Sequence, residues 1–254
     1  MGAMGPRSPH RMWLLLATPL ILITLLIMSW FHWLPGGWFL RNLVEAPAHR
    51  AERLRLEHRA DRLDEFQRQA GDESPGQVVF LGSSTIEFFP LDTCFPDKPV
   101  VNRGIGEEPV RDLRARLRVS IPAKPASVVI YSGAVDFHTH GAPPEALTAE
   151  FHALLQALRR LAPGTPICIL AILPGRNLTD SQVADLARAN TALREAAEAG
   201  GQTFLDTSRP PIVTATGCLA ASHSKDDWHL NGRGYEVLAS WLRDLPGPAS
   251  LPLR

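Results

Sequence analysis

The chain has 254 residues, of which 26 are Lys or Arg and 26 are Asp or Glu, so its formal net charge at neutral pH is zero. A balanced charge excludes strong attraction to an anionic polymer, and we therefore expect no nucleic-acid partner. The three cysteines, Cys94, Cys168 and Cys218, are far apart and odd in number, so they indicate neither a disulfide framework nor a metal site.

The N-terminal part contains the most apolar stretch. After a short tail, residues 1–11, the run MWLLLATPLILITLLIMSWF carries no charged residue. A helix of about 20 apolar residues crosses a bilayer core of about 30 Å, and tryptophans lie near both ends of the run, as in an interfacial aromatic belt. No small-x-small cleavage pattern follows it, which disfavours a cleavable signal peptide. We therefore predict a transmembrane signal anchor over residues 12–33.

Residues 41–72 predict a helical linker. They are rich in Arg, Glu, Leu and Ala, and opposite charges recur at helical neighbour spacings, as for Glu52 and Arg55. We expect this helix to be largely exposed and to pack Leu54, Leu56 and Leu63 against the domain that follows. The turn residues GDESPG end it.

From residue 77 onward, short apolar runs alternate with amphipathic helical patterns. The predicted strands are residues 77–82, 98–102, 126–132, 166–172 and 202–206, and the predicted helices are residues 107–118, 144–161, 179–199 and 231–242. Continuous apolar strands alternating with helices predict a five-stranded parallel sheet covered on both faces, which is a doubly wound α/β domain. We place this domain at residues 77–245 and expect residues 246–254 to be a disordered, Pro-rich tail.

Polar residues cluster at the predicted carboxyl ends of the strands, where such domains bind ligands. The first strand ends in Ser83 and Ser84, and Asp226 and His229 stand just before the last helix. A serine nucleophile needs a base and a group that orients the base, and His229 and Asp226 have the spacing for these roles. Ser84 could instead cap the following helix.

A metal site is the weaker alternative. His138 and His140 alternate in DFHTHG, but no third ligand is evident. Likewise, Asp226 and Asp227 could merely cap the last helix, although Asn231 is the better candidate for that cap. We expect no metal and no cofactor.

Three stretches together resemble the SGNH/GDSL hydrolase superfamily: VFLGSSTIEFF, VVNRGIG and DDWHLNGRGY. The resemblance implies a three-layer αβα, flavodoxin-like fold and a serine esterase. It implies Ser84 as nucleophile, with Ser83 where the family usually has Asp, and His229 as base oriented by Asp226. The backbone N–H groups of Ser84 and Gly104 would form the oxyanion hole.

The third family block departs from this pattern. The family usually has Gly-x-Asn-Asp, whereas the chain reads GAVD, with Val135 in place of the Asn that donates to the oxyanion. Three interpretations stay open. The enzyme is slower, because loss of one donor costs about 10²–10³-fold in rate; or Asn102, Arg103 or His138 supplies another donor; or the site only binds. Asn102, Arg103, Val135 and Trp228 are also candidate substrate-binding residues.

The resemblance and the anchor together lead to an expected function. We expect a membrane-anchored hydrolase that cleaves or transfers short acyl esters, such as O-acetyl groups on envelope or exported polysaccharide. A lipid esterase of the lysophospholipase kind is one alternative, and an inactive accessory protein that binds glycan or an envelope synthase is another. The expected partners are an acyl-ester substrate, the membrane and envelope polysaccharide machinery. The expected location is a bacterial inner membrane, with the domain on the periplasmic side.

Overall fold

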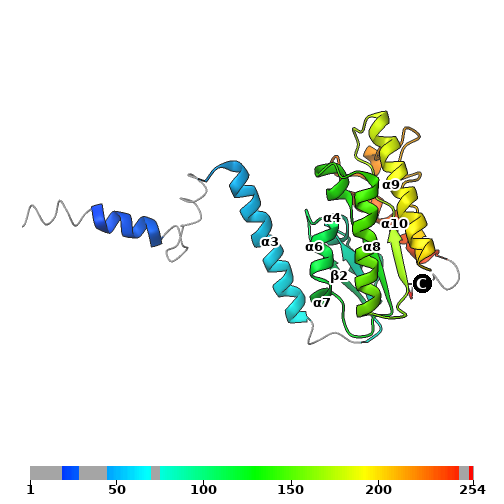
Figure 1. Cartoon of the computed structure of the whole chain (residues 1–254), viewed down its shortest axis with the longest axis horizontal. Helices are drawn as coiled ribbons and strands as arrows, with labels where there is room; N and C mark the ends of the chain where they lie inside the picture. The colour runs from blue at the N-terminus through cyan, green and yellow to red at the C-terminus, as the bar shows by residue number, and fades with distance from the viewer. Residues whose placement is uncertain (1–18, 29–44, 70–74, 246–251, 254) are drawn as a thin grey trace, which may run out of the picture. The chain divides into compact units, whose positions relative to one another are not determined.

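The computed structural model describes residues 19–28, 45–69, 75–245 and 252–253, and Figure 1 shows the chain. The chain divides into two compact units, Met1–His58 and Arg59–Arg254. Residues 19–28 are helical. No helix in the described ranges is both long and apolar enough to span a bilayer. Most of the predicted anchor, and the tail before it, lie outside the described residues.

The sheet has five parallel strands, as the sequence predicts. They are β1 (Val78–Gly82), β2 (Val100–Gly104), β3 (Ser127–Tyr131), β4 (Ile167–Leu170) and β5 (Thr203–Leu205). Their spatial order is β2-β1-β3-β4-β5, and each neighbouring pair is parallel. In this order the chain direction across the sheet reverses between β1 and β3, and this switch point is where doubly wound domains place their ligands.

Helices cover both faces of the sheet, which makes the predicted three layers. The helices that follow β1 in the chain are α4 (Ser84–Glu87), α5 (Leu91–Cys94), α6 (Val110–Ala115), α7 (Leu117–Ser120), the π-helix η1 (Val135–Thr139), α8 (Pro144–Leu161), α9 (Asp180–Ala199), the 3-10 helix η2 (Ala221–His223) and α10 (Gly232–Arg243). Alternate residues of β1 enter two separate cores: Val79 and Leu81 pack with α6, α8 and α9, and Val78 and Phe80 pack with α5 and α10.

The predicted helix at residues 107–118 is shorter and broken. Glu107 has a left-handed backbone with φ of 57°, and Pro109 precedes the first helical residue, so α6 begins only at Val110. Arg116 then separates α6 from α7. The sequence therefore predicted the position of a helical segment correctly, but the first residues of the predicted range form a turn after β2.

The predicted linker helix is present as α3 (Pro47–Gln69). Its expected apolar contacts are wrong in part, because Leu54 and Leu56 are each 50% exposed, whereas Phe66 is fully buried. The tail prediction also fails at one described residue. Leu253 is buried among the side chains of one core cluster, because an apolar side chain gains free energy on leaving water.

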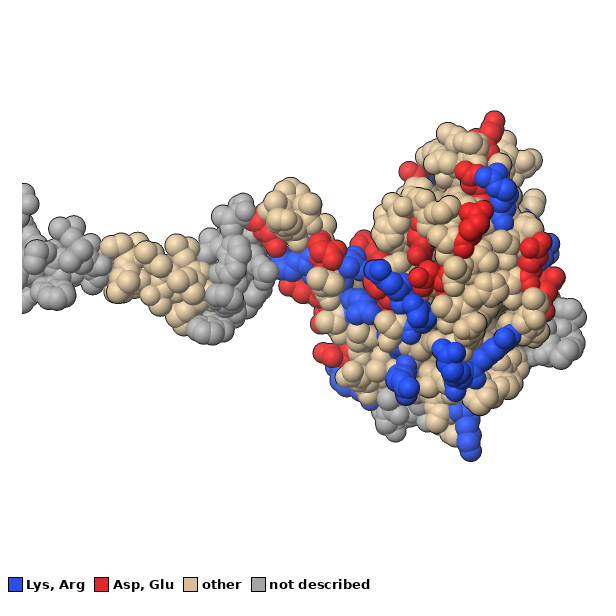
Figure 2. Space-filling model, in the orientation of Figure 1, with Lys and Arg blue, Asp and Glu red and all other residues tan. Residues whose placement is uncertain are grey.

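The surface of the domain carries both signs of charge. On the face in Figure 2, acidic side chains are more frequent toward the top and basic ones toward the bottom. The acidic and basic side chains that balance in the sequence are therefore both present on this face.

Candidate active site

A sharp turn places Ser84 at the carboxyl end of β1. Ser83 donates its N–H to Tyr131 O at 3.1 Å, and α4 begins at Ser84. Two glycines permit this path. A Cβ on Gly82 would lie 1.9 Å from Tyr131 O, and a Cβ on Gly104 would lie 2.1 Å from Glu87 N. A side chain at Gly82 would therefore push the end of β1 away from β3, and one at Gly104 would push α4 away from the end of β2.

The structure brings the three predicted catalytic residues together. His229 Nε2 lies 3.0 Å from Ser84 Oγ, and His229 Nδ1 lies 2.9 Å from both carboxylate oxygens of Asp226. An ionised carboxylate can only accept, so Nδ1 carries the proton and Nε2 is left as the acceptor for the Ser84 hydroxyl. This arrangement can take the serine proton as the hydroxyl attacks an acyl carbon.

Asp226 is held ionised by its own turn. Its Oδ1 accepts the N–H groups of Trp228 at 2.9 Å and His229 at 2.8 Å. Partial burial alone would raise the pKa of Asp226, but these N–H groups and the imidazole outweigh it and lower the pKa to about 2. The carboxylate is therefore charged over the whole range in which a histidine base is neutral.

The capping alternatives do not hold. Ser84 is the first helical residue of α4, and Ser83 occupies the cap position without a side-chain capping bond. Asn231 caps α10 by accepting the Gly234 N–H at 3.1 Å, so neither Asp226 nor Asp227 is needed there.

Gly104 does not present its N–H to Ser84, contrary to the sequence prediction. The Gly104 N–H donates to Asn102 Oδ1 at 2.9 Å. The reason is strand alternation: the Ile105 N–H bonds Gly82 O on β1, so the Gly104 N–H faces the outer side of this edge strand.

The predicted substitute donors are engaged elsewhere. Asn102 Nδ2 donates to Ile86 O at 2.7 Å and to Glu87 O at 3.2 Å. Arg103 is buried and donates to Gln69 and to Asn102 O. His138 Nε2 bonds Leu173 O at 2.9 Å, and burial lowers the pKa of His138.

The third block is structural where it matches the family. Asp136 Oδ2 accepts the Val110 N–H at 3.0 Å and so ties η1 to the start of α6. Val135, the first residue of η1, is half-buried and brings no side-chain donor.

Sequence reasoning missed several residues around the site. A Cβ on Gly106 would lie 3.9 Å from Ser84 Cβ, so the Gly106–Glu107 turn passes beside the nucleophile. Phe88, 44% exposed, meets the His229 ring edge-to-face at 5.3 Å. Tyr235 Oη donates to Thr85 O at 3.0 Å and holds α4 from below. Gly106 alone offered a sequence signal, since it lies in the glycine-rich second block.

Trp228 lies beside the base and is 47% exposed. Its ring is 4.8 Å from that of His138, and a Cβ on Gly175 would approach it to 2.5 Å.

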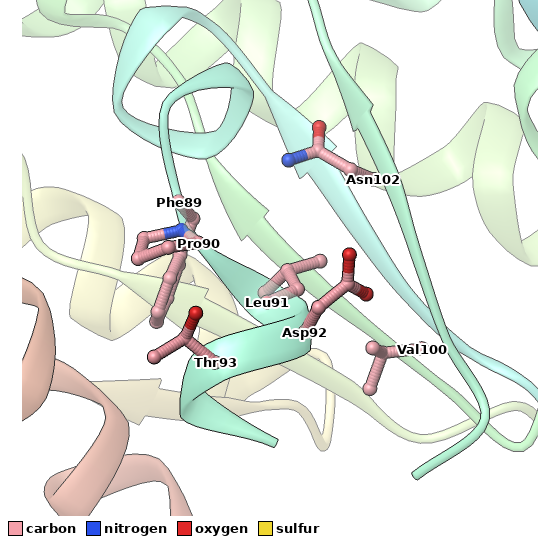
Figure 3. A pocket seen from close by; sticks show the side chains of 7 residues that line it. All are labelled: Phe89, Pro90, Leu91, Asp92, Thr93, Val100 and Asn102. Atoms are coloured by element: carbon pink, nitrogen blue, oxygen red, sulfur yellow. The ribbon is translucent and has the colours of Figure 1, made fainter. Parts of the chain in front are cut away.

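A separate hollow of about 280 Å³ lies between α5 and β2, lined by Phe89, Pro90, Leu91, Asp92, Thr93, Val100 and Asn102 (Figure 3). None of the three catalytic candidates lines this hollow.

Comparison with known proteins gives concordant results. Residues 90–237 match the GDSL-like lipase/acylhydrolase family, a range that includes Asp226 and His229 and begins after Ser84. The α1 subunit of platelet-activating factor acetylhydrolase IB from Rattus norvegicus is 27% identical over 190 residues, which are 71% of this chain and 78% of that protein.

Solved structures share the fold. A putative platelet-activating factor protein from Streptococcus pneumonia superposes with a TM-score of 0.70 at 23% identity, over 76% of this chain and 95% of the other. The acetylxylan esterase Axe2 from Geobacillus stearothermophilus superposes with a TM-score of 0.52 at 21% identity, over 67% and 93%.

Proposed function

Because the chain belongs to the GDSL-like lipase/acylhydrolase family, we propose that it hydrolyses acyl esters through a covalent intermediate on Ser84. The observation that carries this proposal is the continuous hydrogen-bonded chain from Ser84 Oγ through His229 to Asp226. Family membership establishes the acylhydrolase class, and the geometry supports the mechanism.

The reaction proceeds in two halves. Ser84 Oγ attacks the ester carbonyl carbon while His229 Nε2 takes its proton; the tetrahedral intermediate then expels the alcohol, which receives that proton from His229. Water next attacks the acyl-enzyme and gives a proton to Nε2. Collapse of the second intermediate releases the carboxylic acid and returns the proton to Ser84 Oγ. Asp226 stays ionised throughout and stabilises the imidazolium.

Backbone N–H groups hold the oxyanion in this proposal. The first is that of Ser84, at the start of α4, and the second comes from the Gly106–Glu107 turn. The Gly106 N–H donates to Glu87 Oε2 at 2.5 Å, which leaves the Glu107 N–H as the better candidate. With Val135 in the third position, the side-chain donor is missing, and such a loss lowers the rate by about 10²–10³-fold.

The test uses the purified full-length chain with p-nitrophenyl acetate and butyrate. We expect turnover that Ser84→Ala and His229→Ala abolish. Ser83→Ala is the matched control, because Ser83 Oγ is buried and has no hydrogen-bond partner among the described residues. Absence of turnover in the wild-type chain, or equal turnover in Ser84→Ala, would rule out the mechanism and favour the accessory-protein alternative.

The acyl group that we propose the enzyme removes is short, and acetyl is the favoured case. The names of two related proteins, an acetylhydrolase and an acetylxylan esterase, both specify acetyl removal. We favour O-acetyl groups on envelope or exported polysaccharide, either hydrolysed or transferred, and the lipid ester is the alternative. Acetate release from acetylated xylan, compared with release from platelet-activating factor, distinguishes the two classes.

Membrane attachment is part of the proposal. The run from Met12 to Phe31 is uncharged, and within it the helical residues 19–28 expose large apolar side chains such as Leu20 and Ile21. An alkaline phosphatase fusion at the carboxyl end tests the orientation. An active fusion is expected for a domain outside the inner membrane, and an expressed but inactive fusion would contradict that placement.

A further inference from the structure

The C-terminal half of α3 docks behind the strand ends that carry the candidate site. Phe66 of α3 is fully buried, and three guanidinium groups surround its ring. Those of Arg62, Arg103 and Arg116 lie 4.9, 4.8 and 5.5 Å from the ring centroid. Cation–π contacts of this kind are strongest when they are desolvated, so Phe66 anchors the helix firmly.

Arg62 reaches from the docked helix to the backbone of Gly104 and to the side chain of Glu87. Its Nε and Nη2 donate to Gly104 O at 3.2 and 3.1 Å. Its Nε also lies 3.8 Å from Glu87 Oε1. Glu87 is the last residue of α4, whose first residue is Ser84, and Glu87 Oε2 accepts the Gly106 N–H. One guanidinium therefore holds the end of β2, α4 and, through Glu87, the turn beside Ser84.

A buried ion pair extends this contact to β1. Arg116 and Glu108 are 3% and 1% exposed, and Arg116 Nε donates to Glu108 Oε2 at 2.7 Å. Arg116 Nη2 also donates to Gly82 O at 3.2 Å, one residue before Ser83. Arg59 of α3 donates to the other oxygen of Glu108 at 3.4 Å. The helix thus contacts a buried charged cluster that is hydrogen-bonded to the backbone of Gly82, just before the nucleophile turn.

We propose that Arg62 is a positioning residue for ester hydrolysis: the docked helix α3 fixes the Gly104–Glu108 turn relative to Ser84, so that the site is complete only with this helix in place. The proposal rests on the proposed role of Ser84. Its physical basis is that oxyanion donors act only when they are preorganised, and a displacement of about 1 Å caused by a distant change can cost about 10²-fold in rate.

The segment between the apolar N-terminus and the catalytic domain is then more than a spacer. Its first half carries surface ion pairs such as that of Arg55 with Glu52. Its second half supplies Arg59, Arg62 and Phe66 to the domain. Any force or partner that undocks the second half would lower the activity without touching the three catalytic residues.

The experiment compares Arg62→Ala, Arg62→Lys and Arg68→Ala in the full-length chain. Arg68 is the matched control, because it lies on the same helix, is exposed, and donates its Nε to Asp64 O of α3 itself. We expect kcat for p-nitrophenyl acetate to fall about 10–100-fold in Arg62→Ala, with little change in KM. We expect Arg62→Lys to recover part of kcat, since an ammonium can reach Gly104 O but lacks the fork, and Arg68→Ala to match wild type.

The rate of labelling by a fluorophosphonate provides a second measurement and separates this proposal from the proposed function. If the wild-type chain is labelled, and Arg62→Ala has the same kcat and the same labelling rate as wild type, the positioning role of Arg62 is wrong while the role of Ser84 stands. No labelling of the wild-type chain would overturn the role of Ser84 first. If Arg62→Ala does not fold, the comparison of Arg62→Lys with wild type decides: unchanged kcat contradicts the proposal, and lower kcat at an unchanged thermal midpoint supports it.

Discussion

The substitution Asp226→Asn tests the polarity of the hydrogen-bonded chain at the site. Oδ1 of Asp226 accepts two backbone N–H groups, so the amide oxygen of an Asn would take that position. The amide NH2 would then face His229 Nδ1, which must accept and so move its proton to Nε2. In that tautomer Nε2 can no longer take the proton of Ser84. The reverse orientation loses the two backbone bonds, at about 2 kcal/mol in total.

A second effect adds to the first. The carboxylate lies 2.9 Å from Nδ1, and a charge pair with centres about 4 Å apart gains about 4 kcal/mol at an effective dielectric constant of 20. Asp226 is 46% exposed, so solvent screening reduces this to about 3 kcal/mol. The two effects sum to about 5 kcal/mol on the barrier, which is about 10⁴-fold in kcat.

The assay is the initial rate of p-nitrophenyl acetate hydrolysis at saturating substrate. Asp227→Asn is the matched control, because it makes the same chemical change one residue further along the chain. We expect Asp227→Asn to retain nearly full kcat. If Asp226→Asn kept a tenth of wild-type kcat, or if the two variants lost equal amounts, the assignment of Asp226 as the orienting residue would be wrong.

Four further predictions follow from the same geometry. Val135→Asn should raise kcat by about 10²-fold by restoring a donor, whereas Val135→Ala should not; no gain in Val135→Asn would mean that the oxyanion is already fully held. Because the pKa of Asp226 falls from 3.8 to about 2 on folding, its ionised form stabilises the fold above pH 4 and this contribution is lost as the pH falls through 2. The difference in urea midpoint between wild type and Asp226→Asn should therefore narrow from pH 5 to pH 2; a constant difference contradicts this. Tyr235→Phe leaves the buried Thr85 carbonyl without its donor and should cost about 1–3 kcal/mol in urea unfolding, and no change would show that the bond contributes nothing. Glu107→Gly relieves a left-handed residue and should stabilise the chain by about 1 kcal/mol in urea unfolding; a variant no more stable than wild type would show that the backbone at Glu107 is not strained.

Much of the domain could be predicted from the sequence, because its signals are local. The five apolar runs become the five strands within a few residues, and the long patterns at 144–161 and 179–199 become α8 and α9. The ends of these elements are marked by Pro, Gly and polar residues. The meeting of Ser84 with His229, 145 positions later, could be suggested from the polar strand ends, and the family resemblance made it specific.

The wrong predictions concern features that depend on contacts between strands and helices rather than on the local sequence. Whether the Gly104 N–H faces Ser84 depends on the alternation of an edge strand, which its sequence does not reveal. The side of α3 that packs on the domain is held by a single phenylalanine, Phe66, beside arginine side chains, so the sequence of α3 shows no apolar stripe on that side. The turn at Glu107 carries a left-handed non-glycine residue, and residue propensities would place it inside a helix.

Covalent labelling by a fluorophosphonate tests whether Ser84 is an activated nucleophile, because only an activated serine reacts readily. The full-length chain is incubated with the probe, digested, and analysed by mass spectrometry for the modified residue. We expect one adduct, on Ser84, that persists in Ser83→Ala and disappears in Ser84→Ala and His229→Ala. An adduct on Ser83, or labelling of Ser84 that does not depend on His229, would contradict it.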